Sequence, residues 1–155
     1  MSEPQAKKFF PRVVIESPLR GTVPLWVPLW AAPLAEYLGR WRNKQYARAC
    51  MRDSVHRGEA PYASHLLMDQ PGILDDADEE ERGRGMDIGF RWGEHADIRA
   101  VYCDHGISGG MQHGILCAPQ GQRIEYRWLY PYRVPHIAEQ VQVMRKQLEV
   151  RRGRS

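Results

Sequence analysis

Short apolar runs alternate with longer amphipathic segments along most of the chain. The runs are rich in β-branched or aromatic residues, which predicts strands at residues 12–15, 60–64, 98–103 and 123–129, the last a half-buried edge strand. Apolar residues at three- and four-residue steps predict helices at residues 33–57, 76–95, 109–118 and from Pro135 through Leu148. Strands that alternate with helices at this spacing predict an α/β domain, with a parallel sheet and helices on both faces.

The chain has 155 residues, which suits one domain. Residues 1–11 are polar and are expected to form a flexible lead-in, and residues 12–150 form the domain. Residues 22–32 are a Trp- and Pro-rich insertion built on the tandem V-P-L-W of Val23–Trp30. Its prolines oppose a helix interior and a central strand, and its tryptophans need an apolar surface. The segment could be a lid, a packed flap or a subunit contact, and the subunit contact is favoured because exposed apolar patches usually mark interfaces.

Composition narrows the classes of function. The net charge of +3, with the basic excess near the end of the chain, is too small to indicate a nucleic-acid partner. The three cysteines have no paired spacing and no C-x-x-C motif, which predicts reduced thiols and a cytoplasmic protein. Charged residues or prolines interrupt every apolar run, so no membrane span or signal peptide is expected. The six histidines and three cysteines lack the spacing of a metal site, and no cofactor is expected.

The stretch that follows the 98–103 run has the pattern of a ligand-binding turn. Asp104 ends the run, and a glycine-bearing loop leads through Ser108 into a predicted helix. The first N–H groups of a helix lack partners and carry the positive end of its dipole, so this turn suits an anion such as phosphate. Ser108 can cap the helix and also offer its hydroxyl to a ligand. A plain strand-to-helix turn with a serine cap is the alternative, and this stretch alone leaves both open.

Two other loops follow predicted strands. Ser17, Arg20 and Gly21 combine a hydroxyl, a planar cation and a residue that permits close backbone approach, which would suit a phosphate, although a surface turn explains the same string. His65 follows the 60–64 run, where a lone histidine is more often structural than catalytic. The carboxyl ends of parallel strands form the ligand edge of an open α/β sheet. These loops and the one after Cys103 are therefore expected to converge.

Two polar features of the helices also lead to expectations. Asp76, followed three residues later by Glu79, predicts a capping box at the start of the 76–95 helix. The acidic cluster there is expected to complement the helix dipole and not to hold a metal. Asn43 lies in the middle of the 33–57 helix, and its default interpretation is a polar residue that faces solvent.

Four short motifs follow one another along the chain: Ser17-Pro-Leu-Arg-Gly21, the helix with Asn43, Pro61-Tyr-Ala-Ser-His65 and Ser108-Gly-Gly-Met-Gln-His-Gly114. Their order resembles the nucleoside 2-deoxyribosyltransferase-like superfamily, which includes nucleoside 5′-monophosphate N-glycosidases. The likeness is closest to small uncharacterised bacterial and phage domains of that superfamily, and it covers about residues 12–130. The V-P-L-W insertion is not part of the pattern.

The resemblance implies a fold and a ligand. The fold would be a flavodoxin-like, Rossmann-type three-layer sandwich with a mostly parallel sheet of four to five strands, usually in a homo-oligomer. The ligand would be a nucleotide or a nucleoside-like small molecule at the carboxyl edge of the sheet. By the resemblance, the phosphate would be held by Ser17, Arg20, Gly21 and Ser108, and the other ligand-binding residues would be Asn43, His65, Gly109, Gly110 and Met111.

The resemblance also raises a question about catalysis. In the enzymes, a G-x-E-x-G string supplies a glutamate that attacks the anomeric carbon, and here the string is Gly110-Met-Gln-His-Gly114. Gln112 thus stands where the glutamate would be, and an amide is a very poor nucleophile. Asp104 could act as the carboxylate and His113 as a base, although residues 112 and 113 of a helix point in different directions.

Three hypotheses follow. The first is a nucleotide-binding protein with reduced or absent glycosidase chemistry. The second is an active N-glycosidase or deoxyribosyltransferase, acting on a nucleoside 5′-monophosphate through Asp104 or another carboxylate. The third is a non-catalytic interaction protein that uses the tryptophan loop. The first is favoured, because the phosphate-side residues match the family pattern and the glutamate does not.

Overall fold

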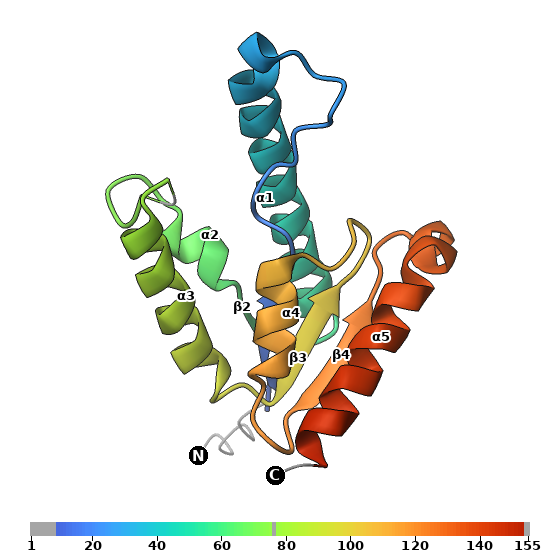
Figure 1. Cartoon of the computed structure of the whole chain (residues 1–155). Helices are drawn as coiled ribbons and strands as arrows, with labels where there is room; N and C mark the ends of the chain where they lie inside the picture. Colours follow the sequence, from blue (N-terminus) through green and yellow to red (C-terminus); the bar gives the residue numbers. More distant parts are fainter. Residues whose placement is uncertain (1–8, 76, 154–155) are drawn as a thin grey trace.

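The computed structural model describes residues 9–75 and 77–153, which form a three-layer α/β fold of the Rossmann and flavodoxin-like type (Figure 1). Within these residues the four strands are β1 (Arg12–Glu16), β2 (Ala60–Tyr62), β3 (Ile98–Tyr102) and β4 (Arg123–Arg127). They make one sheet in the order β2-β1-β3-β4, and every neighbouring pair is parallel. The predicted fold class is confirmed, with a sheet that is parallel throughout.

In the part of the chain that the structure describes, five α-helices and two short 3-10 helices connect and cover the strands. The α-helices are α1 (Ala32–His56), α2 (Ser64–Met68), α3 (Glu79–Gly93), α4 (Gly109–Leu116) and α5 (Val134–Arg152). The 3-10 helices are η1 (Leu29–Ala31) and η2 (Pro131–Arg133). None of the described helices combines the length and the apolar character that crossing a membrane requires.

Two apolar clusters hold the layers together, one on each face of the sheet. Tyr46 and Cys50 of α1 pack on the face formed by alternate residues of the central strands, including Ile15 and Ala100. On the opposite face, α4 and α5 pack together over Val101 and its neighbours. Because successive strand residues point to opposite faces, the fully buried β3 contributes to both clusters, as a central parallel strand should.

The helix caps depart from expectation in one place. Asp78 caps α3, since its Oδ1 accepts hydrogen bonds from the N–H groups of Glu80 and Glu81, each at 2.9 Å. The predicted cap, Asp76, lies outside the described residues. Ser108 caps α4 as predicted, its hydroxyl accepting from the Met111 N–H at 3.4 Å.

α1 is much longer than the strands that it covers. Its 25 residues span about 37 Å, whereas a five-residue strand spans about 17 Å, so its first turns project beyond the carboxyl edge of the sheet (Figure 1). We call residues 23–41, the insertion loop and these turns, the arm. Its large apolar side chains are mostly exposed: Leu25, Trp26, Leu29, Trp30, Leu34, Tyr37, Leu38 and Trp41. With Trp26 82% and Trp30 85% exposed, the loop is not a flap packed on its own chain.

Candidate functional site

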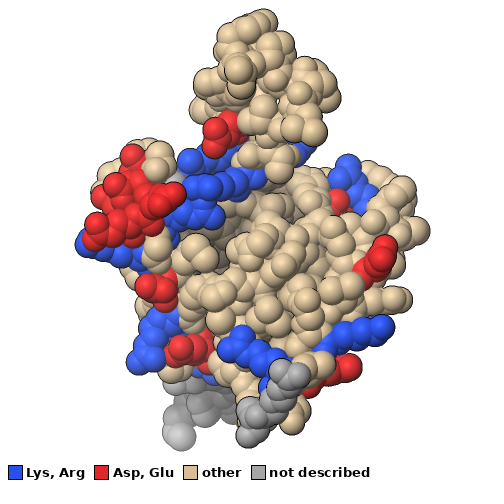
Figure 2. Space-filling model, in the orientation of Figure 1, with Lys and Arg blue, Asp and Glu red and all other residues tan. Residues whose placement is uncertain are grey.

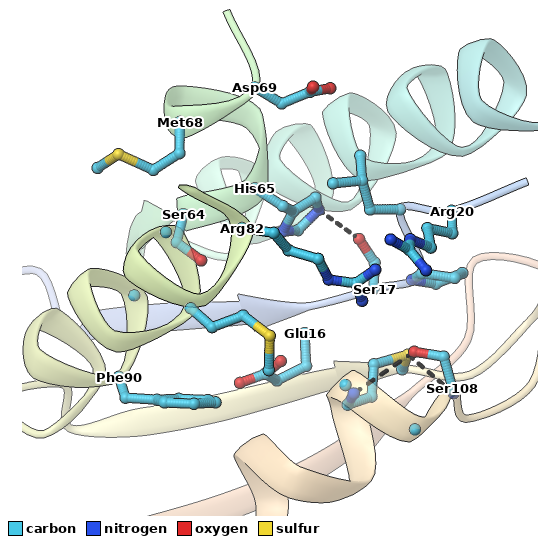
Figure 3. Close-up of a pocket in the computed structure, with 18 of the residues that line it drawn as sticks. Glu16, Ser17, Arg20, Ser64, His65, Met68, Asp69, Arg82, Phe90 and Ser108 are labelled. Atoms are coloured by element: carbon cyan, nitrogen blue, oxygen red, sulfur yellow. Dashed lines mark hydrogen bonds between the residues drawn. The ribbon is translucent and has the colours of Figure 1, made fainter. Parts of the chain in front are cut away.

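A cavity of about 380 Å³ opens at the carboxyl edge of the sheet (Figure 3). Its walls are the loop after β1, α2, the face of α3 that points to the sheet, and the first turn of α4. β1 lies between β2 and β3 in the sheet. The chain goes from β1 to β2 on one side and then crosses to β3 on the other side, so the two connections diverge at β1. This is the switch point at which open α/β sheets bind ligands. The structure brings the three loops after β1, β2 and β3 to this one cavity.

The first turn of α4 forms one wall of the cavity. Ser108, Gly109, Gly110 and Met111 all line it. The first intrahelical bond runs from the Gln112 N–H to the Ser108 carbonyl, so the N–H groups of Gly109 and Gly110 precede the hydrogen-bonded ladder. They are available to an anion, as expected for the positive end of a helix dipole.

Two arginines from different elements line the same cavity. Arg20 comes from the loop after β1, and Arg82 extends from α3 toward Ser17 (Figure 3). Figure 2 shows basic side chains gathered in the hollow beneath the arm, beside the acidic start of α3. Sequence reasoning missed Arg82. The available signal was helical spacing, because Arg82, Met86 and Phe90 follow one another at four-residue steps and all face the cavity.

Ser17 and His65 meet at the centre of the site, with the Ser17 Oγ and the His65 Nε2 2.9 Å apart. Ser17 is buried at the end of β1, and His65 lies in the first turn of α2. Burial lowers the pKa of His65 to about 4, against the attraction of the Asp69 carboxylate. The imidazole is therefore neutral at physiological pH, so its role here is hydrogen bonding and not charge attraction to an anion.

Asn43 does not face solvent, and the default interpretation was wrong. Only 3% of it is exposed, and its Nδ2 donates to the carbonyls of Leu19 and Arg20 at 3.3 and 2.7 Å. It does not line the cavity. Asn43 instead fixes the backbone of the loop that carries Arg20, so it can act on a ligand only through that loop.

Gly21 also lies outside the cavity lining. A Cβ at this position would sit 2.4 Å from the Glu36 carbonyl oxygen, and one at Gly39 would sit 2.8 Å from the Gly21 Cα. The two glycines let the loop cross directly over α1. The close backbone approach expected at Gly21 is thus to α1 and not to a ligand.

The predicted carboxylate, Asp104, is outside the cavity and has its acceptors occupied. Its Oδ2 accepts from the Tyr46 hydroxyl at 2.5 Å and the Leu129 N–H at 2.9 Å, and its Oδ1 accepts from the Tyr130 N–H at 2.7 Å. It is 5% exposed. These contacts give Asp104 a structural role, which is to join α1 to the chain that leaves β4.

Gln112 and His113 also do not line the cavity. Gln112 is exposed, and its Nε2 donates to the Ile107 carbonyl at 3.4 Å. The His113 ring lies 5.0 Å from the ring of Phe90, and its Nε2 is 3.5 Å from the Cys117 Sγ. Phe90 is itself a cavity residue, so His113 lies behind the wall and not on it.

A carboxylate that sequence reasoning did not select lies in the cavity. Glu16 is the last residue of β1, and its side chain pairs with Arg99 of β3. The signal in the sequence was the same as for Asp104, an acidic residue at the end of an apolar run. Within the described residues, no group of three or more His, Cys, Asp or Glu side chains is placed to hold a metal ion.

Comparison with known families gives a match over most of the chain. A family model described as "Domain of unknown function (DUF7768)" matches residues 11–127. The matched region begins just before β1 and ends with β4, so it includes every element around the cavity. No curated protein and no solved structure matches the chain.

Proposed function

We propose that this chain, which belongs to the DUF7768 family, binds a nucleoside 5′-monophosphate or a similar nucleotide-derived anion at the carboxyl edge of its sheet. The observation that carries the proposal is the meeting of Arg20, Arg82 and the α4 N-terminus on one cavity. Two guanidinium groups and free backbone N–H groups are the donors that phosphate prefers. A volume of about 380 Å³ is within the range of small-molecule sites.

The resemblance to the nucleoside 2-deoxyribosyltransferase-like superfamily supports the same ligand class. Of the residues that the resemblance associates with the phosphate, Ser17, Arg20 and Ser108 line the cavity. Gln112, at the place of the nucleophilic glutamate, is exposed and outside it. The proposal is therefore binding with reduced or absent glycosidase chemistry.

Isothermal titration with nucleoside 5′-monophosphates and the matching nucleosides tests the proposal. We expect the monophosphates to bind at least about tenfold more tightly, because only they reach the cationic wall. Arg82→Ala should weaken monophosphate binding by about 10- to 100-fold. Arg84→Ala is the matched control, because Arg84 is exposed on the same helix, pairs with Glu80 and lies outside the cavity. No binding of any monophosphate, or equal binding by the Arg82 variant, would contradict the proposal.

One observation favours a second function, N-glycosidase chemistry on the same ligand. The cavity contains a carboxylate, Glu16, whose pKa is raised by burial even though Arg99 acts in the opposite direction. Carboxyl groups with such environments are common at catalytic sites. Chromatography of a nucleotide panel after incubation tests for free base, and its release should be lost in Glu16→Gln. If the wild type releases no base, the protein is a binding protein only.

We further propose that the arm is a contact between two copies of this chain. An apolar surface with two exposed tryptophans that stands clear of the domain is typical of a subunit interface. Light scattering should give a mass of at least twice the monomer, and the double variant Trp26→Ala/Trp30→Ala should shift it toward one chain. A monomeric wild type would refute this.

The described cysteines, Cys50, Cys103 and Cys117, are free thiols, which supports a cytoplasmic location.

A further inference from the structure

Glu16 is held at the bottom of the cavity by a chain of buried polar groups. Arg99, 2% exposed, donates through Nη1 to the Glu16 Oε1. Its Nε donates to the Gln122 Oε1 at 3.0 Å. The Gln122 Nε2 in turn donates to the carbonyls of Gly93 and Ala96 at 2.7 and 2.8 Å. This network of hydrogen bonds joins the Glu16 carboxylate to the backbone at the end of α3, so the position of the carboxylate is fixed without any ligand.

Two glycines leave room for this arrangement. A Cβ at Gly93 would lie 2.9 Å from the Arg99 Nη2, and a Cβ at Gly114 would lie 2.6 Å from the Glu16 Oε1. The ion pair therefore occupies the space that side chains of α3 and α4 would otherwise fill. Close packing on both sides prevents the carboxylate from turning away from the cavity.

The second oxygen of Glu16 has no hydrogen-bond donor among the described residues. Across residues 9–75 and 77–153, Oε1 accepts from Arg99 and Oε2 accepts from no protein group. Glu16 lines the cavity, with 16% of its side chain exposed. A half-satisfied carboxylate in such a place needs a hydrogen-bond donor from water or from a ligand.

The cavity has two chemically different ends. In Figure 3, Glu16 and Phe90 lie toward one end, and Arg20 with the guanidinium of Arg82 lies toward the other. The cationic end suits an anion. The other end offers the Glu16 carboxylate as an acceptor and the aromatic ring of Phe90, which suits a flat or ring-shaped group that carries a donor.

We infer that Glu16 is a specificity residue: its Oε2 accepts a hydrogen bond from a hydroxyl or amino group on the nucleoside part of the bound monophosphate. This rests on the proposed function and names the ligand class more closely, as an anion joined to a ring that carries a donor. A site with a fixed acceptor rejects an analogue without the donor, because the acceptor then loses water and gains nothing. The donor can belong to the sugar or to the base.

The test compares ligands that differ in the donors of one part of the molecule, either the sugar hydroxyls or the amino group of the base. Ribonucleoside 5′-monophosphates are titrated into the protein beside their 2′,3′-dideoxy counterparts, and beside counterparts whose base lacks its exocyclic amino group. We expect the loss of one of these donors to weaken binding to the wild type by about 10- to 100-fold. The pair that shows the loss identifies the source of the donor.

Glu16→Gln keeps the size of the side chain and a carbonyl oxygen for Arg99, but it presents an NH2 group to the cavity in place of Oε2. It should bind the donor-bearing and donor-lacking ligands within about threefold of each other, with the phosphate contribution kept. Glu94→Gln is the control for the lost charge, because Glu94 caps α3 on the surface and pairs with Arg91. It should discriminate as the wild type does.

The outcomes separate the two proposals. If monophosphates bind the wild type and loss of either donor changes nothing, the role of Glu16 is refuted while the proposed function stands. Discrimination that persists in Glu16→Gln refutes it equally. If no monophosphate binds, the proposed function fails and this inference fails with it.

Circular dichroism shows whether Glu16→Gln is folded. Glu16→Asp, which withdraws the carboxylate by one methylene, supplies a second variant that should also lose discrimination.

Discussion

The carboxyl ends of β1 and β3 lie side by side, and each carries an acidic residue with opposite surroundings. Asp104, after β3, accepts three hydrogen bonds and lies outside the cavity. Glu16, at the end of β1, accepts one from the described residues and lines the cavity. A carboxylate that is buried outside the cavity, with both oxygens bonded to its own chain, stabilises the fold and does not reach a ligand. A carboxylate held by one oxygen only is fixed and still able to bind.

The largest effect on stability is expected when the acid-to-amide change is made at Asp104, and the same change at Glu16 gives the comparison. Asp104→Asn puts an NH2 group against the N–H or O–H donors of Tyr46, Leu129 and Tyr130, so we expect it to lower the free energy of unfolding by about 2–4 kcal/mol. Glu16→Gln at neutral pH should lower it by less, about 1–2 kcal/mol, because Gln still accepts a hydrogen bond from Arg99 but no longer balances its buried charge. Urea denaturation measures both. Equal losses would remove the distinction between the two ends.

The next effect tests what holds Glu16. Arg99→Met leaves the carboxylate buried without its partner and should cost about 2–3 kcal/mol at pH 7. The pKa of Glu16 is already raised by burial, and without Arg99 it should rise further. Position 16 of the folded variant then keeps its proton to a higher pH than in the unfolded chain. The deficit of the variant, which is its loss of unfolding free energy relative to the wild type, should therefore shrink as the pH falls toward 4.5.

Denaturation of Arg99→Met at several pH values, with Arg99→Met/Glu16→Gln as the control, measures this. The double variant has no carboxylate to protonate at position 16, and it should lose the pH-dependent part of the deficit. A deficit that is the same at every pH in the single variant would show that Glu16 is not the group left unpaired.

A smaller effect concerns His65, which contacts Ser17 in the same cavity. Burial lowers the pKa of His65 to about 4 in the folded protein, against 6.5 for the free side chain. The unfolded chain therefore takes up a proton first, so this stability is fully present above pH 6.5 and is lost as the pH falls through about 4. The chemical shifts of the His65 imidazole, followed by NMR as the pH is varied, measure this pKa directly.

His65→Gln should remove this part of the pH dependence, with a loss of roughly 1 kcal/mol at pH 7 from the broken bond to Ser17. Ser17→Ala should keep the pH dependence, because burial and not the hydrogen bond is the largest cause of the lowered pKa. A His65 that titrates near 6.5 in the folded wild type would contradict the buried site.

The smallest effect is expected at Gln112. It is exposed and outside the cavity, so Gln112→Glu should change stability by less than about 0.5 kcal/mol and monophosphate binding by less than twofold. It should release no additional base. A gain in base release in this variant would show that position 112 reaches the ligand, and it would return the catalytic question to the start of α4.

Much of the fold follows from local pattern. The apolar run of β3, the helical spacing of α1 and α5 and the Ser108 cap depend on residues near one another in the chain, and these predictions are confirmed. The expectation that three loops would converge rests on one general property, because all strands of a parallel sheet point their carboxyl ends to the same edge.

The predictions that failed involve contacts across the chain. Asn43 was expected to face solvent, yet a loop more than 20 residues earlier crosses it and takes both of its amide hydrogens. Gly21 was expected beside a ligand, yet it lies on α1 because Gly39 leaves space there. Nothing within a helical turn of either residue indicates these partners.

The sequence by itself determined the layers, the direction of the strands and the edge where loops meet, because hydrophobic period and caps act over a few residues. Only the tertiary structure decided which of the two carboxylates is bonded through both oxygens within the protein and which one faces the cavity. The Asp104 carboxylate accepts hydrogen bonds from Tyr46, 58 positions away, and from the chain after β4. The Glu16 carboxylate accepts through one oxygen from Arg99, 83 positions away. Such pairings depend on which elements pack together, and a spacing rule along the chain does not encode that.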